Sequence, residues 1–341
     1  MGKKNKAILS IFMEAIGLYF SNFDKFIKYM SFPVLGQIVG LLLIFILTYF
    51  YAQNMPVLIQ KFSVFDNYML LVGVLILLIL PGLVIFIKSF WEYLVAYGAL
   101  NSMYENMQKS GKVYDFDAHT ELIKRRTLPF IGLWFLFGVF SLFSICPLLW
   151  VVCAVFAVFF VLVFQVFTFE PELTPLGCVK KSLILVKGHF ASTFTLMALV
   201  GALTYVLIPN LANQLFAYVN ATNLFSSWVE VMIKDIPLDV LNGFLSKIYL
   251  QPLDLKTISL FAVSVTITQI FIQFTLPLRS ILWAMWYKEL NGALPKLVEK
   301  KSAKKSKTPS EKLMKESHKK FTSKKLDRNI LKRAMQKDEE S

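Results

Sequence analysis

The sequence predicts an all-α, multi-pass membrane protein: a bundle of six transmembrane helices with interfacial amphipathic helices and a basic cytoplasmic tail. Long stretches carry no charge, charged residues gather between them, and 56% of the 341 residues are hydrophobic while 17% are charged. About a quarter of the residues in a typical soluble domain are charged. About 20 apolar helical residues cross the roughly 30 Å core of a bilayer. The composition therefore excludes an ordinary soluble domain.

Six stretches are suitable spans. We expect them at about 32–51, 68–87, 128–145, 148–169, 190–208 and 257–278. Residues 1–292 then form the membrane domain, and Pro33 falls in the first turn of span one, where proline is tolerated. Residues 293–341 form the tail, which has too little apolar surface to fold alone and is expected to be largely disordered.

Spans three and four come from residues 128–169, which include no charged residue. As one helix this stretch would be about 63 Å long, twice the thickness of the hydrocarbon core. It is therefore predicted to be a hairpin that turns at Ser144-Ile145-Cys146-Pro147, because proline ends one helix and can begin the next.

Residues 190–229 are also uncharged, but amide and hydroxyl side chains crowd their second half. Burying such groups in lipid without partners costs a few kcal/mol each. We therefore expect span five to end at Pro209 and a long loop with two amphipathic helices to follow, up to Lys256.

Two amphipathic segments are expected in the membrane interface. In residues 7–28 the polar positions recur every three or four residues and form one stripe on a helix. In residues 175–187, Thr174 is a suitable N-cap and Pro175 a suitable first residue. Leu176, Val179, Leu183 and Val186 are expected to face the acyl chains. The candidate interfacial site consists of Glu170, Lys180, Lys181, Ser182, Lys187 and Gly188.

Lys and Arg alternate between rich and poor connections. The N-terminal 28 residues have five, the first connection one, the second six, the third none, the fourth three, the long fifth three and residues 296–341 sixteen. The positive-inside rule then places both termini in the cytoplasm. Arg279 lies near the cytoplasmic end of span six, and we expect it to snorkel to the interface.

The tail has sixteen basic and seven acidic residues. Its last part predicts a basic amphipathic helix whose candidate lipid-binding residues are Lys324, Lys325, Arg328, Lys332 and Arg333. Anionic membrane lipid headgroups are the expected partner. A solvated tail without a partner and a tail that binds RNA or another polyanion are the alternatives. Nucleic acid is disfavoured because Phe321 is the one aromatic residue available for stacking on bases.

No catalytic, cofactor-binding or metal-binding residue is predicted. Nucleotide-binding, zinc-protease, dithiol and nucleophile-elbow motifs are all missing from the sequence. Asp115, Asp117, His119 and Glu121 are together, but such residues also begin a solvated helix. Cys146 and Cys153 are about 10 Å apart along a helix, too far for a disulfide, and are expected to be small buried residues.

Short patterns in the fourth connection and after span six resemble those of a known family. They are Glu170-Pro171, Lys181-Ser182-Leu183, Val186-Lys187-Gly188-His189-Phe190 and Trp286-Tyr287-Lys288-Glu289-Leu290. They are similar to patterns in the glycerophosphoryl diester phosphodiesterase membrane-domain family and the related YciC-like integral membrane proteins, over roughly residues 7–292. The chain departs from the family at Asn291-Gly292, where a basic residue is frequent. The resemblance implies a six-helix domain of the bacterial inner membrane, without the separate catalytic barrel.

Spans two and six also share an order of residues. Pro81 or Pro277 is followed by Lys88-Ser89 or Arg279-Ser280, and then by Trp91 or Trp283. Either an internal duplication of a helix hairpin or the common chemistry of membrane interfaces accounts for this order.

These observations favour a non-enzymatic protein that organises membrane components or associates with lipid. One alternative is a transporter or permease subunit for a small or lipidic molecule, which a water-filled cavity lined by Gln165, Gln269 and Gln273 would favour. Another is a membrane-protein assembly factor whose tail binds ribosomal RNA or another anionic partner.

The orientation is testable by labelling single cysteines from outside intact cells, in a background without the native cysteines. Residues 215–250 should be labelled, whereas residues 105–125 and 295–341 should not. Labelling at position 110 would overturn the orientation.

Overall fold

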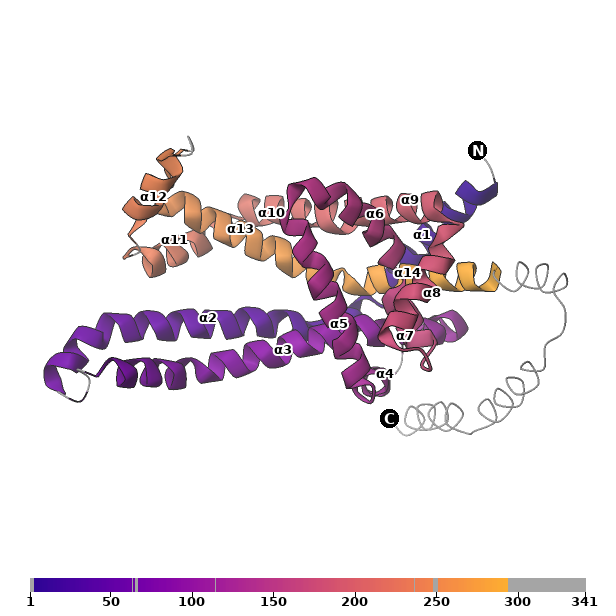
Figure 1. Ribbon diagram of the computed structural model, residues 1–341. Coiled ribbons are helices and arrows are strands. Elements are labelled where there is room, and N and C mark those ends of the chain that lie inside the picture. The colour runs from indigo at the N-terminus through magenta and orange to yellow at the C-terminus, as the bar shows by residue number, and fades with distance from the viewer. Residues whose placement is uncertain are drawn as a thin grey trace. The chain divides into compact units, whose positions relative to one another are not determined.

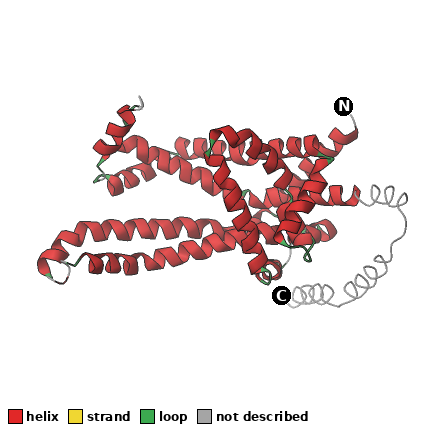
Figure 2. Ribbon diagram, in the orientation of Figure 1, coloured by secondary structure: helices red, strands yellow, loops and turns green. Residues whose placement is uncertain are grey.

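The computed structural model describes residues 3–62, 64, 67–113, 115–235, 237–247 and 251–293. These residues form helices joined by short turns, with no strand among them (Figure 2). Six helices in this part of the chain are long and apolar enough to cross a membrane: Phe23–Lys61, Tyr68–Gln108, Thr127–Ile145, Pro147–Phe169, Phe190–Tyr218 and Leu255–Gly292. The prediction of an all-α, multi-pass membrane protein with six spans is confirmed.

The helices are labelled in Figure 1. The first seven are α1 (Lys3–Ser21), α2 (Phe23–Lys61), α3 (Tyr68–Ser110), α4 (Phe116–Lys124), α5 (Thr127–Leu142), α6 (Trp150–Phe160) and α7 (Val163–Phe169). The others are α8 (Pro175–Lys187), α9 (Phe190–Gly201), the π-helical segment η4 (Ala202–Leu207), α10 (Ile208–Tyr218), α11 (Ala221–Ile233), α12 (Leu238–Lys247), α13 (Leu255–Phe274) and α14 (Leu276–Ala293). A helix satisfies its backbone N–H and C=O groups internally, as a lipid environment requires.

The chain forms two compact units. Among the described residues, unit 1 combines residues 3–23, Val95–Met197 and residues 280–293. Unit 2 combines Asp24–Leu94 with Ala198–Arg279.

In unit 2, α2 and α3 form a long antiparallel hairpin (Figure 1) that is held closely together by small residues. Gly36 and Gly40 are spaced as in a GxxxG motif, in which glycines let two helix backbones approach. A Cβ on Gly40 would lie 2.7 Å from Phe86 N and 2.8 Å from Gly82 O. The sequence analysis did not identify this motif, although its spacing was visible.

Helices α2 and α3 are longer than the predicted spans. They have 39 and 43 residues, or about 58 and 65 Å at 1.5 Å per residue. Pro33 is buried well inside α2 and is not in its first turn, so that expectation is wrong.

The predicted amphipathic helix over residues 7–28 is also wrong, because α1 ends at Ser21 and α2 begins at Phe23. The buried Asn22 side chain lies at this break. Its Nδ2 donates to Gly111 O at 3.1 Å, and its Oδ1 accepts from Val113 N at 3.0 Å. Gly111 has φ +71°, which favours glycine. The Asn22 side chain at this break thus binds the turn that follows α3.

The fifth span does not end at Pro209 as predicted. The helix continues through η4 and α10 to Tyr218, and Pro209 lies in the first turn of α10, where its missing N–H is tolerated. The polar side chains that disfavoured this extension find partners on α13. Asn213 Nδ2 donates to Thr268 Oγ1 at 2.8 Å, and Ser264 Oγ donates to Asn213 Oδ1 at 3.1 Å. Helices α11 and α12 confirm the two predicted amphipathic segments.

The predicted hairpin between spans three and four is confirmed in unit 1. Two short 3-10 turns, Phe143–Ile145 and Pro147–Leu149, flank an extended Cys146. Trp150 Nε1 closes the turn by donating to Ser144 O at 2.8 Å. Below the turn, the Trp134 and Phe164 rings lie 4.8 Å apart between their centroids.

The expectation for the cysteines is wrong in part. Cys146 is exposed and Cys153 is half-buried, while Cys178 on α8 is the buried one. Burial raises the pKa of the Cys178 thiol to about 11, so this thiol stays neutral and unreactive near neutral pH.

The α2–α3 contact predicts a sharp effect of adding one methyl group. Gly40→Ala should destabilise the protein by about 1–3 kcal/mol, because the new Cβ meets backbone atoms of the facing helix. Gly73→Ala on α3 is the matched control. A Cβ there has nothing within 4 Å, and alanine favours the helix by up to about 1 kcal/mol. Thermal unfolding in detergent measures both, and equal midpoints would contradict the close packing.

Candidate functional site

Helix α8 carries most of the sequence-predicted interfacial residues, and its start is as predicted. Pro175 is its first residue, and Thr174 Oγ1 accepts from Gly177 N at 3.2 Å. Of the four residues expected to face the acyl chains, Val186 is buried against the protein instead. The buried face consists of Cys178, Ser182, Leu185 and Val186.

The reason is that α8 packs on α5, α6 and α7 within unit 1. Small side chains on the inner face permit close approach. Ser182 Oγ donates to Phe159 O at 2.6 Å and is fully buried. Leu176, which was expected to face the acyl chains, is 69% exposed, and its contact with lipid stays a prediction.

Glu170 is the centre of a polar cluster in unit 1. Its Oε1 accepts from Tyr287 Oη at 2.7 Å and lies 3.4 Å from Lys181 Nζ. The Phe169 and Tyr287 rings stack with centroids 5.2 Å apart. We call Glu170, Lys181, Tyr287 and Phe169 the Glu170 cluster.

This cluster connects the end of α7, helix α8 and helix α14. It therefore brings together the two sequence segments whose patterns carry the family resemblance. Trp286, next to the cluster on α14, donates from Nε1 to Thr193 Oγ1 at 3.0 Å. Tyr287 and Trp286 were not predicted as site residues, although they belong to the quoted pattern.

The structure does not bring the remaining predicted residues into this cluster. Lys180, Lys187 and Gly188 are exposed, and Gly188 ends α8 in the right-handed α region. Lys324, Lys325, Arg328, Lys332 and Arg333 lie outside the described residues.

The Glu170 carboxylate already has a hydroxyl and an ammonium partner. This arrangement is a charge-assisted tie between three helices. Lys181 and Glu170 have side chains that are 30% and 26% exposed, so the ion pair contributes modestly and the tyrosine hydrogen bond is the stronger element.

His119 has a structural environment. Its Nδ1 lies 2.8 Å from Ser102 Oγ and its Nε2 lies 2.9 Å from Asn106 Nδ2, which fastens α4 to α3. Burial lowers the pKa of the imidazole, so His119 is neutral near pH 7. The neighbouring Asp115 caps α4 by accepting from Ala118 N at 3.0 Å. Over the described residues, no group of three His, Cys, Asp or Glu side chains could hold a metal ion.

Unit 2 contains a pocket between α2 and α13 that has a volume of about 210 Å³. Its lining residues are Val34, Gln37, Ile38, Leu41, Val265, Thr266, Gln269, Ile270 and Gln273, and we call it the glutamine pocket. Gln37 Nε2 donates to Pro33 O at 2.7 Å and to Gln273 Oε1 at 3.3 Å.

Of the three glutamines expected around a cavity, Gln269 and Gln273 line this pocket. Gln165 is buried in unit 1, where its Nε2 donates to Asn101 Oδ1 at 3.1 Å. Gln37 was missed by the sequence analysis. Its position was visible in the sequence as an amide side chain within an otherwise apolar span, as for Gln269 and Gln273 in span six.

Arg279 does not snorkel as predicted. It is 6% exposed, and its Nη2 donates to Ile272 O at 2.8 Å, toward the preceding helix α13. Its guanidinium carbon lies 4.6 Å from the centroid of the Tyr205 ring. Its Nε has no hydrogen-bond partner among the described residues. A charge in a membrane span costs about 2.5–3.5 kcal/mol even on lenient scales.

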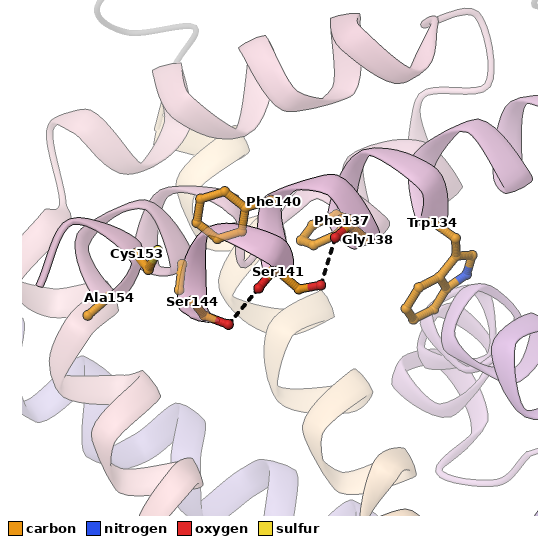
Figure 3. Close-up of a pocket in the computed structure, with 9 residues that line it drawn as sticks. Trp134, Phe137, Gly138, Phe140, Ser141, Ser144, Cys153 and Ala154 are labelled. Carbon is orange, nitrogen blue, oxygen red and sulfur yellow. Dashed lines mark hydrogen bonds between the residues drawn. The ribbon is translucent and has the colours of Figure 1, made fainter. Parts of the chain in front are cut away.

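The α5–α6 hairpin of unit 1 forms an open groove of about 600 Å³ (Figure 3). Its lining residues are Trp134, Phe137, Gly138, Phe140, Ser141, Ser144, Cys153, Ala154 and Ala157. Both serine hydroxyls donate to carbonyls of their own hairpin, Ser141 to Gly138 O at 2.7 Å and Ser144 to Ser141 O at 2.6 Å. The groove is thus predominantly apolar and provides no cluster of reactive groups.

Comparisons of the chain with protein-family models, curated proteins and solved structures find no match. The family resemblance therefore rests on the quoted sequence patterns.

The Glu170 cluster predicts that Tyr287→Phe lowers the free energy of unfolding in detergent by about 1.5–3 kcal/mol, because a hydrogen bond to a carboxylate is lost. Glu170→Gln should weaken the same contact, and the double variant should lose less than the sum of the two. Glu172→Gln removes an exposed carboxylate nearby and should leave stability unchanged. Strict additivity of the Tyr287 and Glu170 effects would contradict the tie.

Proposed function

We propose that this chain is a non-enzymatic, lipid-associated protein of the bacterial inner membrane, and that the glutamine pocket binds the neutral polar part of a lipidic or small molecule. The observation that carries the proposal is the presence of three carboxamide side chains in one pocket between membrane-spanning helices. Amide groups at such positions are unfavourable in lipid unless they have partners.

The lining chemistry defines the ligand class. Gln37, Gln269 and Gln273 supply both donors and acceptors, and the lining contains no charged residue. A hydroxyl, ester or amide group matches such a site better than an ion does. The aliphatic residues around the amides suit adjoining hydrocarbon. A volume of about 210 Å³ is below the 300–1,000 Å³ of typical drug-sized sites, so the pocket fits a glycerol-sized fragment of a lipid.

The distribution of Lys and Arg supports a placement with both termini in the cytoplasm. The basic C-terminal residues would then be close to the anionic inner leaflet, which attracts them at about 1 kcal/mol per basic residue. The resemblance at the fourth connection supports the assignment to a bacterial membrane domain.

A transporter or permease subunit is the second candidate. The glutamine pocket is lined by one helix from each of two hairpins, α2–α3 and α10–α13, and the π-helical segment η4 interrupts the span that leads into α10. Interrupted spans and sites between repeated units are common in secondary transporters. π-Helical segments are frequent at functional sites.

The test uses diacylglycerol, which offers one hydroxyl and two ester carbonyls, in a photo-crosslinkable form. Gln273→Leu should lower its labelling about two- to tenfold, because one hydrogen bond is lost. Gln60→Leu on the exposed part of α2 is the control and should label like the wild type. Absence of saturable labelling of the wild type contradicts the proposal. Movement of diacylglycerol between leaflets of proteoliposomes by the wild type, abolished in Gln273→Leu, would favour the transporter.

A further inference from the structure

We propose that Arg279 is the centre of a second binding site in unit 2, which takes a phosphate oxyanion from a phospholipid headgroup. This inference rests on residues that do not line the glutamine pocket, so the two proposals succeed or fail separately.

The charge of Arg279 is not balanced by the described residues around it. The side chain is 6% exposed and lies on a membrane-spanning helix. Within the described part of the chain the guanidinium contacts the Ile272 carbonyl and the Tyr205 ring, and both are neutral. Neither partner compensates a full positive charge in a medium of low dielectric constant.

The Arg279 guanidinium also has N–H donors that the residues described by the structure do not use. A guanidinium has five N–H donors in a planar fork. Nη2 donates to Ile272 O, and Nε is buried without a partner among the described residues. A phosphate offers several acceptors and accepts two parallel hydrogen bonds from one arginine, a geometry that a lone carbonyl cannot match.

A purely structural role for Arg279 leaves this charge unexplained. Helix α13 ends at Phe274, and α14 begins at Leu276, so Ile272 O lies at a helix end that needs a donor. Thr275 Oγ1 already donates to Ile272 O at 2.7 Å. A neutral side chain therefore suffices to satisfy the carbonyl.

Arg279 lies close to a surface from which a lipid headgroup can reach it. The Tyr205 ring covers the guanidinium, and Tyr205 itself is 50% exposed. The next two residues of η4, Val206 and Leu207, are 56% and 52% exposed and apolar, as suits contact with acyl chains. A rotation of the tyrosine side chain would open Arg279 to the surface that η4 presents. A phospholipid is therefore favoured over a soluble anion as the source of the phosphate.

The first hairpin offers a natural comparison. Lys88 Nζ lies 5.5 Å from the Phe32 ring centroid, so a cation again faces an aromatic ring. Lys88 is exposed, however, and its ammonium can be solvated. Burial of the cation thus distinguishes Arg279 from Lys88, which makes Lys88→Gln a matched control for the loss of one charge.

The experiment measures binding of phosphatidylglycerol to the full chain in neutral detergent by the rise of its unfolding midpoint. A salt concentration of about 0.5 M screens exposed basic residues, including those of the C-terminal segment, more than it screens a buried site. The variants are Arg279→Gln, Arg279→Lys and Lys88→Gln. Diacylglycerol, which lacks the phosphate, and inorganic phosphate are titrated in parallel.

Phosphatidylglycerol should raise the midpoint of the wild type more than diacylglycerol does, because only the former carries a phosphate. Arg279→Gln should weaken the apparent affinity about tenfold or more, because the paired charge is lost. Arg279→Lys should retain part of the affinity, and Lys88→Gln should change it less than about twofold. An equal rise with inorganic phosphate would overturn the lipid as the source of the oxyanion.

Two results would overturn the site itself. One is a wild-type midpoint that responds equally to phosphatidylglycerol and to diacylglycerol, which lacks the phosphate; this comparison needs no variant to be folded. The other is an Arg279→Gln variant that keeps the wild-type response to phosphatidylglycerol.

Discussion

Absence of water in the hydrocarbon core is the constraint from which the rest of this structure follows. It forces the backbone into helices, and it requires each buried polar side chain to find a partner within the protein. Asn213 meets this requirement at two hydroxyls of α13. Outside the spans, the buried Asn22 and Ser182 are paired in the same way, at the turn after α3 and at a carbonyl of α6. These hydrogen bonds join segments that are distant in sequence, so the demand for polar partners selects the tertiary contacts.

The same constraint explains the packing. Apolar side chains gain little by leaving lipid for another helix, so close approach between backbones has to supply the attraction. Gly40 and Gly82 allow this in the α2–α3 hairpin, and Ser182 allows it on α8. In unit 1 aromatic rings add to the attraction, with a charged contribution where the Arg126 guanidinium carbon lies 4.0 Å from the Phe167 ring centroid.

Two features of unit 2 point to ligands. The glutamine pocket presents neutral donors and acceptors, whereas Arg279 presents a charge, and these features select different chemical groups. The Glu170 cluster differs from both, because its carboxylate is already paired with a hydroxyl and an ammonium. The residues behind the family resemblance thus act as a tie between helices, and the proposed ligand sites belong to unit 2. A cation facing an aromatic ring recurs at Lys88 and Arg279, as expected either from a duplicated hairpin or from common interface chemistry.

The helical class, the six spans, the turn at Cys146 and the start of α8 are predictable from the sequence, because charge-free length and proline or threonine capping are local properties. The extent of the spans depends on tertiary contacts, since the continuation past Pro209 requires Asn213 to meet Thr268 and Ser264 on another helix. Tertiary contacts also decide which face of α8 is buried, because the neighbours are protein helices, and the periodicity of α8 alone could not identify them. Arg279 shows most clearly which features cannot be predicted from the sequence. Position along the chain predicted a side chain that reaches the interface, but its direction depends on a carbonyl of α13 and a ring of η4, and no local pattern encodes these partners.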